Sequence, residues 1–295
     1  MRFRSASLAI ALVTLITTAA PAIVAAQSQA PAAPLNLKSP VTAESAEPDF
    51  ALINLPTTRP LRLWKQNFHL THRFLGNLRS GSFTENLGNA FGLDNGAVIG
   101  LEYRIEPIKN VQAIVYRNSA DKTIQFSTQI DAVRQRGAMP VSVSLIASVE
   151  GNKNFGWGAG DGHDHTGGTA HHYKSPALGA SISRTFSDRA AVYAVPVWVH
   201  HSLVSDLPPR DTFVLGTGAR VRVTDSVYLV GELAPRLGGY KPNKNSFAFG
   251  FEKRSGGHMF LLTLTNSYST TFAQIARGGF PTTLYLGFNL GRKFL

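Results

Sequence analysis

Six of the nine histidines of this 295-residue chain fall in one glycine-rich stretch and at the end of one apolar run. Neutral imidazole is a preferred nitrogen ligand of Zn²⁺, Cu²⁺ and Ni²⁺, and histidine tracts with glycine spacers bind such ions. Because no fixed ligand spacing such as HExxH occurs, a hydrophilic, weakly basic loop is the competing interpretation. The candidate metal ligands are His163, His165, His171, His172, His200 and His201.

A second candidate group consists of charged residues that alternate with apolar neighbours. If their segments are strands of a barrel, the charges face the interior and lie near its periplasmic side. Five bases stand against three acids. Two interpretations follow: a salt-bridge lattice that braces the wall, or a charged constriction that selects anionic or zwitterionic solutes. The members are Glu102, Arg104, Asp131, Arg220, Arg222, Glu252, Arg254 and Lys293.

Catalytic arrangements are sparse by comparison. His72 falls on an apolar face between Leu70 and Phe74, where outer-membrane phospholipases set a Ser–His pair against lipid. Such chemistry needs a serine beside the imidazole and an orienting Asn or Asp, yet no HxSNG-like motif occurs. In His201-Ser202 the two side chains of adjacent strand residues point to opposite faces. We therefore expect no enzymatic activity and no cofactor.

The elements that carry these residues are about twelve segments with period-2 alternation that follow Lys65. Their lengths suit tilted strands that cross a bilayer, and single-chain bacterial barrels have an even number of strands. The sequence predicts an all-β, transmembrane, antiparallel up-and-down β-barrel over residues 65–295. The predicted strands are 65–77, 96–106, 110–118, 122–134, 140–150, 177–187, 190–201, 212–224, 226–235, 245–254, 257–267 and 282–294.

The two faces of these segments differ in composition. In 245–254, Phe247, Phe249 and Phe251 alternate with Gly250 and Glu252. In lipid the apolar set must face outward, which leaves the small and charged set to line the lumen. The segment 110–118 is apolar on both faces, so its orientation stays open. Lumen-side glycines admit curvature or the close approach of a plug; they are Gly216, Gly218, Gly250, Gly287 and Gly291.

Connections of alternating length give an independent signal. Residues 151–176 follow the fifth predicted strand, whereas Asp225 alone joins the eighth to the ninth. Outer-membrane barrels have long outside loops and short periplasmic turns. The pattern therefore predicts a protein of the bacterial outer membrane with both termini in the periplasm.

Three stretches precede the predicted barrel. Residues 1–26 have a basic start, an apolar run and a small-residue end, which predicts a secretory signal peptide. Residues 27–50 are rich in Ala, Pro and Ser and predict a disordered tail. The more apolar stretch 51–64 could pack against the inner mouth or enter the barrel. We therefore take 27–64 as a flexible periplasmic N-terminal segment and a possible plug. The chain has no cysteine, so no disulfide holds it together.

The chain resembles a bacterial family of outer-membrane β-barrels of unknown function. The resemblance runs in order through INLPTTRPLRLWKQNFHLTHRF (53–74), FGLDNGAVIGLEYRIEP (91–107) and VYAVPVWVHH (192–201), and departs most at 156–175. It implies a barrel in the outer membrane and no particular activity. LYLGFNLGRKFL (284–295) resembles the C-terminal signal that such barrels present to the barrel-assembly machinery.

The formal net charge is +11, or +9 without Arg2 and Arg4 of the signal. No nucleic-acid motif occurs, so export makes outer-membrane lipid and lipopolysaccharide the expected partners of this basic surface. The basic excess among the interior charges favours a narrow porin-like channel for small anionic or zwitterionic solutes. The alternatives are a non-conducting surface protein, either for metal capture or as an envelope scaffold, and a lipid-acting barrel enzyme.

Overall fold

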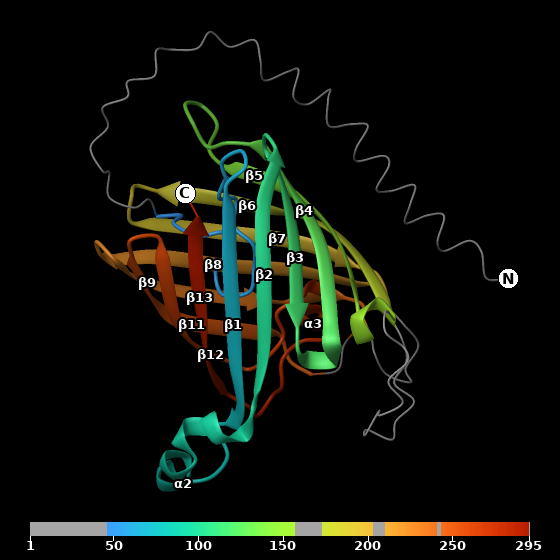
Figure 1. Ribbon diagram of the computed structural model, residues 1–295, viewed down its shortest axis with the longest axis vertical. Coiled ribbons are helices and arrows are strands. Elements are labelled where there is room, and N and C mark those ends of the chain that lie inside the picture. The colour runs from blue at the N-terminus through green and yellow to red at the C-terminus, as the bar shows by residue number, and fades with distance from the viewer. Residues whose placement is uncertain (1–45, 157–172, 203–209, 241–242, 295) are drawn as a thin grey trace, which may run out of the picture. The chain divides into compact units, whose positions relative to one another are not determined.

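Twelve antiparallel strands close into one barrel in the computed structural model, which describes residues 46–156, 173–202, 210–240 and 243–294 (Figure 1). Neighbours in sequence pair with each other, and β1 pairs with β13 to close the ring. The three-residue β10 pairs with β8 beyond the end of β9, so it is not counted among the twelve strands of the wall. The predicted fold class and strand number are confirmed.

The observed strands keep close to the predicted segments. They are β1 (Gln66–Asn77), β2 (Ala97–Ile108), β3 (Val111–Asn118), β4 (Thr123–Val133), β5 (Ser142–Gly151), β6 (Lys174–Phe186), β7 (Ala190–Val199), β8 (Thr212–Thr224), β9 (Val227–Ala234), β10 (Arg236–Gly238), β11 (Ser246–Ser255), β12 (His258–Thr265) and β13 (Tyr285–Phe294).

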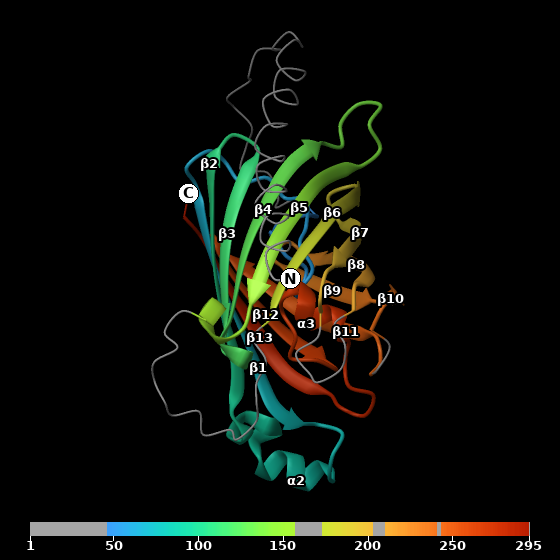
Figure 2. The ribbon, with the colours of Figure 1, turned by 90° about the vertical axis from the view of Figure 1, so that its right-hand side faces the viewer.

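The two ends of the barrel differ in their connections (Figure 2). At one end, here called the short-turn end, adjacent strands are joined by brief turns such as the one between β8 and β9. The opposite, long-loop end carries α2 (Phe83–Gly88), η1 (Ala90–Asn95), η2 (Ala120–Lys122), η3 (Lys153–Gly156) and α3 (Phe272–Ala276). None of the helices in the described ranges has the length and apolar composition needed to cross a bilayer.

The two faces of the wall separate as the alternation predicts. On β2, Ile99 and Leu101 are exposed on the outside of the barrel, and Arg104 is buried within it. The structure also orients β3, which the sequence leaves open: Gln112 is buried inside and Val115 is exposed. Apolar residues gather outside because lipid tails offer no hydrogen-bond partners, whereas polar residues find partners in the lumen.

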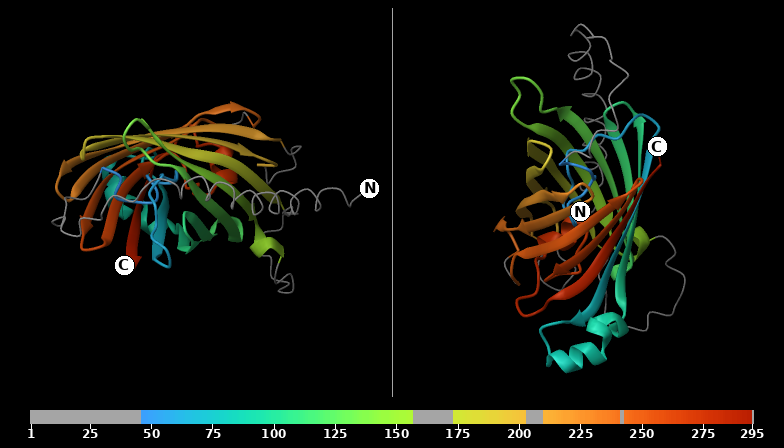
Figure 3. Two further views of the ribbon diagram at one scale, coloured as in Figure 1. Left: turned by 90° about the horizontal axis from the view of Figure 1, so that it is seen from above. Right: turned by 90° about the vertical axis from the view of Figure 1, so that its left-hand side faces the viewer.

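Residues 46–59, here called the plug, lie inside the ring of strands (Figure 3). The chain folds back on itself there: the amide of Thr57 donates to the carbonyl of Phe50 at 2.9 Å, and that of Leu52 to Leu55 at 2.8 Å. Ordered packing begins earlier than the predicted tail boundary at Ala51, because Phe50 and the residues before it find apolar and charged partners in the lumen.

Glycines of β8 make room for the plug. A Cβ added to Gly216 would lie 2.9 Å from the side chain of Leu55, and one added to Gly218 would lie 2.5 Å from Leu52. Both leucines are almost fully buried and pack with Val195 and other inward residues in a single apolar cluster. The glycine faces of the wall and the leucines of the plug are therefore complementary in shape.

The long-loop end is closed from the other side. The connection between β12 and β13 folds back into the barrel, and α3 lies inside the ring of strands (Figure 2). Ala273, Ile275 and Ala276 are buried there and join the same apolar cluster as the plug. The sequence predicts 268–281 as an outside loop, without this inward fold. Small and aliphatic side chains let the loop pack in a space that the wall leaves open.

The fit between the plug and Gly216 is testable because the chain has no cysteine. Ile53→Cys places a single thiol in the plug, where Ile53 is 1% exposed, so a soluble maleimide should label it slowly. Adding Gly216→Val to this variant should overpack the contact with Leu55 and destabilise the bound plug by about 1–3 kcal/mol. Labelling should then be at least about fivefold faster. The matched control is Gly231→Val, where a Cβ meets open space. Equal rates in the two valine variants would contradict this packing.

Candidate functional site

A buried charge network joins the plug to the wall near the short-turn end. Arg254 on β11 contacts Asp49 of the plug at 3.0 Å and Glu252 at 2.7 Å. Arg220 on β8 contacts the other oxygen of Glu252 at 2.8 Å and donates to the carbonyl of Ala51 at 2.8 Å. These side chains are at most 4% exposed, so each charge depends on its protein partners rather than on water.

Phe50 extends this network with its aromatic ring. The guanidinium carbon of Arg104 lies 5.2 Å from the ring centroid, and the ammonium of Lys293 lies 5.9 Å from it. Lys293 also donates to the carbonyl of Pro48. Cations over an aromatic face are attracted by its quadrupole, and the attraction grows when both groups are removed from water. One apolar residue of the plug thus contacts basic side chains from two strands.

Glu232 on β9 holds the plug from another direction. Its Oε2 accepts from the backbone amides of Ile53, Asn54 and Leu55 at 3.1, 2.9 and 3.1 Å. Its Oε1 accepts from the side-chain amide of Asn54 at 2.6 Å. Arg73 on β1 donates to the oxygen of that amide at 2.9 Å. A carboxylate that accepts several amide hydrogens is among the stronger hydrogen-bond arrangements in proteins.

On the side of the barrel formed by β3, β4 and β6, neutral side chains donate hydrogen bonds to the plug. Gln129 on β4 donates to the carbonyl of Thr57 at 2.9 Å, and Ser181 on β6 donates to that of Pro56 at 2.9 Å. Gln112 on β3 donates to the carbonyl of Arg59 at 3.1 Å. Hydrogen bonds or ion pairs with the plug therefore come from at least eight of the twelve wall strands: β1, β3, β4, β6, β8, β9, β11 and β13.

The eight charged residues predicted to line the lumen fall into separate groups. Arg220, Glu252 and Arg254 form one network, as described above. Arg104 pairs with Glu102 at 3.1 Å, although Glu102 lies halfway along β2 rather than near its short-turn end. The remaining three members pair outside the predicted set: Asp131 with Arg134, Arg222 with Asp188 and Asp225, and Lys293 with the plug.

Sequence reasoning missed two acidic residues on which the site depends. Asp49 falls in the stretch predicted to be a disordered tail, and its position just before an apolar run was the available signal. Glu232 alternates with the outward Leu229 and Leu233 on β9, so the alternation rule that found Glu252 applied to it as well. The geometry adds both to the site because each holds plug and wall together.

The buried carboxylate of Glu150 anchors the inward loop that carries α3. Glu150 at the end of β5 accepts from the backbone amide of Ala273 at 3.0 Å and from the hydroxyls of Thr271 and Tyr173 at 2.8 and 3.2 Å. Burial and the nearby carboxylate of Glu150 raise the pKa of Tyr173, so its hydroxyl stays protonated and remains a donor. The loop with α3 is thereby fixed inside the long-loop end.

Between plug and loop a cavity of about 60 Å³ remains, with a second of about 10 Å³ beside Glu232. Volumes of this size hold a few water molecules. The main cavity is lined by polar and apolar residues of both closures and of the wall, including Ala51, His69, Glu102, Tyr116, Gln129 and Thr270.

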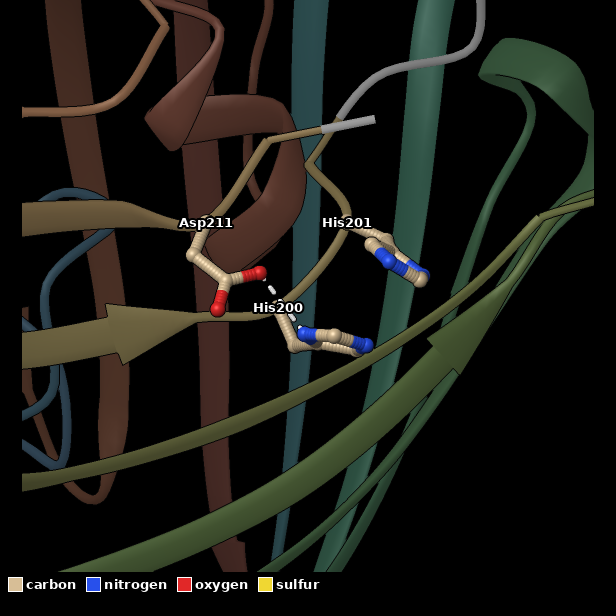
Figure 4. Close-up of side chains that lie close together, drawn as sticks. All are labelled: His200, His201 and Asp211. Carbon is tan, nitrogen blue, oxygen red and sulfur yellow. Dashed lines mark hydrogen bonds and ion pairs between the residues drawn. The ribbon is translucent and has the colours of Figure 1, made fainter. Parts of the chain in front are cut away.

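Two of the predicted metal ligands lie together at the long-loop end. His200 and His201 follow β7 and stand beside Asp211, which precedes β8 (Figure 4). His163, His165, His171 and His172 lie outside the described residues.

The side chains of His72 and Ser202, considered from the sequence as candidates for lipid hydrolysis, contact groups other than a catalytic partner. His72 stacks on Phe288 with ring centroids 4.8 Å apart. The Ser202 hydroxyl bonds to the Thr212 hydroxyl at 3.0 Å and to the Arg210 carbonyl at 3.3 Å.

A closed antiparallel barrel with an apolar outer face and a polar, filled lumen defines an outer-membrane β-barrel protein. The chain belongs to the family described as "Membrane bound beta barrel domain (DUF5777)", which matches residues 49–294. That range begins at Asp49, so it includes most of the plug as well as the barrel. The protein is located in the bacterial outer membrane.

The chain is similar to several solved structures at low sequence identity. The NanC porin is 8% identical at a TM-score of 0.45, with 78% of this chain and 99% of the porin covered. LpxR from Salmonella typhimurium is 11% identical at 0.38, with 77% and 100% covered. The outer membrane channel DcaP of Acinetobacter baumannii is 8% identical at 0.31, with 77% and 72% covered. These similarities carry no information on what this chain binds. No curated protein matches the chain in sequence.

Replacing Glu232 by glutamine, which has nearly the same shape, tests whether its carboxylate holds the plug. Glu232→Gln keeps the size of the side chain but removes the charge that faces three plug amides, a loss of about 1.5–3 kcal/mol for bonds to a charged group. Measured with a single thiol at Leu52→Cys, maleimide labelling should accelerate about tenfold. The control is Glu85→Gln on the exposed α2. A rate no faster than that of the control would exclude Glu232 as a plug anchor.

Proposed function

We propose that the protein is a plugged channel for small anionic or zwitterionic solutes, with residues 46–59 in the closed position. The short-turn end faces the periplasm in this proposal, as in other outer-membrane barrels. The observation that carries it is the ion pair between Asp49 and Arg254, 3.0 Å apart inside the barrel. A solute carboxylate would occupy the place that the plug carboxylate holds in the closed state.

The charges left behind by the plug favour anions. Around the Asp49 position the wall contributes Arg220, Arg254 and Lys293 against the single acid Glu252. When the plug withdraws, this part of the wall has an excess of two positive charges. Basic rings at a narrow point attract anions and repel cations, which is the usual basis of anion selectivity in pores.

The connection of the plug to the barrel supports its movement. After residue 59 the chain leads to Trp64, whose amide donates to the carbonyl of Glu106 at 2.8 Å, and then enters β1 at the short-turn end. The plug can therefore leave through that end without breaking a strand pair. Its polar contacts are individually modest, each about 0.5–3 kcal/mol, so a partner that competes for several of them would shift the equilibrium.

A non-conducting surface protein is the second candidate, favoured by the second closure at α3. If the loop held by Glu150 never leaves, the barrel stays shut even without the plug. In either case we propose a role without catalysis.

Conductance of the purified barrel in a planar bilayer separates the two candidates. The native protein should be closed, because the plug and the inward loop lie inside the barrel, with cavities of about 60 and 10 Å³ beside them in the described part of the chain. Deleting 46–59, alone or together with shortening of 268–281, should produce channels that favour Cl⁻ over K⁺. The control deletion removes 82–88, which includes α2 on the loop between β1 and β2. Absence of conductance in all plug and loop variants at any voltage would reject the channel and support the surface protein.

The basis of selectivity is tested in the plug-deleted variant that conducts. Arg254→Gln removes one of the positive charges that Asp49 leaves exposed, so the Cl⁻/K⁺ permeability ratio should fall about fivefold, the effect of about 1 kcal/mol at a partly hydrated site. Reversal potentials in a KCl gradient measure the ratio. Arg79→Gln, in the exposed loop after β1, is the matched control. An unchanged ratio in the Arg254 variant would show that another part of the lumen selects the ion.

A further inference from the structure

Two successive histidines at the long-loop end present their rings on the same side of the chain. Residues that follow one another in a strand normally point to opposite faces. His201 avoids this because its φ of 52° lies in the left-handed region, which is uncommon for a residue other than glycine. The ring centroids of His200 and His201 are consequently 3.6 Å apart, with 29° between the ring planes.

A carboxylate completes the group from the neighbouring strand. Val199 at the end of β7 pairs with Thr212 at the start of β8, so Asp211 lies beside His200. Its Oδ1 is 2.7 Å from Nδ1 of His200, and one potential ligand atom from each of the three residues falls within 4.8 Å of the others (Figure 4). Both His200 and Asp211 are partly exposed, at 36% and 46% of the side chain, so an ion from solution can reach them.

The backbone that carries these side chains is fixed on several sides. The amide of His200 donates to the carbonyl of Pro176 on β6 at 2.9 Å, and the hydroxyl of Ser175 donates to the carbonyl of His201. Arg277, from the inward loop, donates to the carbonyl of Ser202 at 2.7 Å. A site mounted on such a framework needs only small side-chain rotations to bind an ion, which lowers the entropic cost of binding.

The geometry points to a surface site for a divalent transition-metal ion, built from His200, His201 and Asp211. Two imidazole nitrogens and one carboxylate oxygen suit Zn²⁺ and Cu²⁺, and leave open positions for water or an outside ligand. Calcium and magnesium are disfavoured because they require mostly oxygen ligands. Cu²⁺ should bind more tightly than Zn²⁺, following the general order of affinities of these ions. The site is separate from the plug and from the proposed channel.

Trp198 offers a built-in reporter for this site. Its ring centroid lies 5.6 Å from that of His200, so Cu²⁺ bound there should quench its fluorescence. The chain has two other tryptophans, which Trp64→Phe and Trp157→Phe remove. Replacing His163, His165, His171 and His172 by alanine in the same protein eliminates the other predicted ligands from the titration.

In this protein, made without an affinity tag and kept in detergent, Cu²⁺ should quench Trp198 with saturation at one ion per chain. Zn²⁺ should reverse the quenching by competition. His201→Asn should weaken Cu²⁺ binding at least about tenfold, the usual result of damaging a ligand set. Asparagine tolerates the left-handed backbone, so the fold is retained. His258→Asn, at the short-turn end, is the matched control and should change nothing.

Two results would overturn the site. One is the absence of saturable quenching up to 1 mM Cu²⁺ in the parent protein. The other is an equal Cu²⁺ affinity in the His201→Asn and His258→Asn variants. Retention of the barrel is checked in every variant by its shifted mobility in unheated gel samples, so a weaker titration is attributable to the lost ligand.

Discussion

Charge pairing inside a closed wall is the constraint on which this structure depends. The barrel satisfies its backbone hydrogen bonds strand to strand and turns its apolar side chains to lipid, which leaves the charged residues in the lumen. Arg254 and Arg220 are nearly inaccessible to water there, and a buried guanidinium without an acidic partner is costly. Glu252 lies between the two arginines, and the plug supplies Asp49 as the further carboxylate.

The plug therefore has two physical roles. Its leucines fill the space over the glycines of β8, and its polar groups complete the hydrogen bonding of the wall. In the proposed open state, water and solute ions would take over the polar contacts of the plug. The loop with α3 closes the opposite end by a different means, through one buried carboxylate on β5 and small apolar residues. The two closures thus meet in one apolar cluster, with a small cavity between them.

The sequence predicts the wall well and its contents poorly, for a physical reason. Alternation is a local property of each strand, and lipid on one side makes it strict, so Ile99 and Arg104 could be oriented directly. On β3 an inward Ile114 and an outward Val115 are both apolar, and the polar inward residues Gln112 and Asn118 lie only near its two ends. Whether Glu232 meets another charge or three backbone amides depends on residues that lie some 180 positions away in the chain. Such pairing leaves no local pattern. The same holds for Asp49, whose surroundings resemble a disordered tail until the barrel encloses it.

Hydrogen–deuterium exchange of the intact protein in lipid nanodiscs tests the occupied lumen most directly. The amides of Ile53, Asn54 and Leu55 donate to Glu232, and that of Leu52 donates within the plug. A peptide spanning these residues should exchange as slowly as peptides from the strands of the wall. Exchange at the rate of an unstructured peptide would contradict the account, because the plug would then be outside the barrel and its charges unpaired.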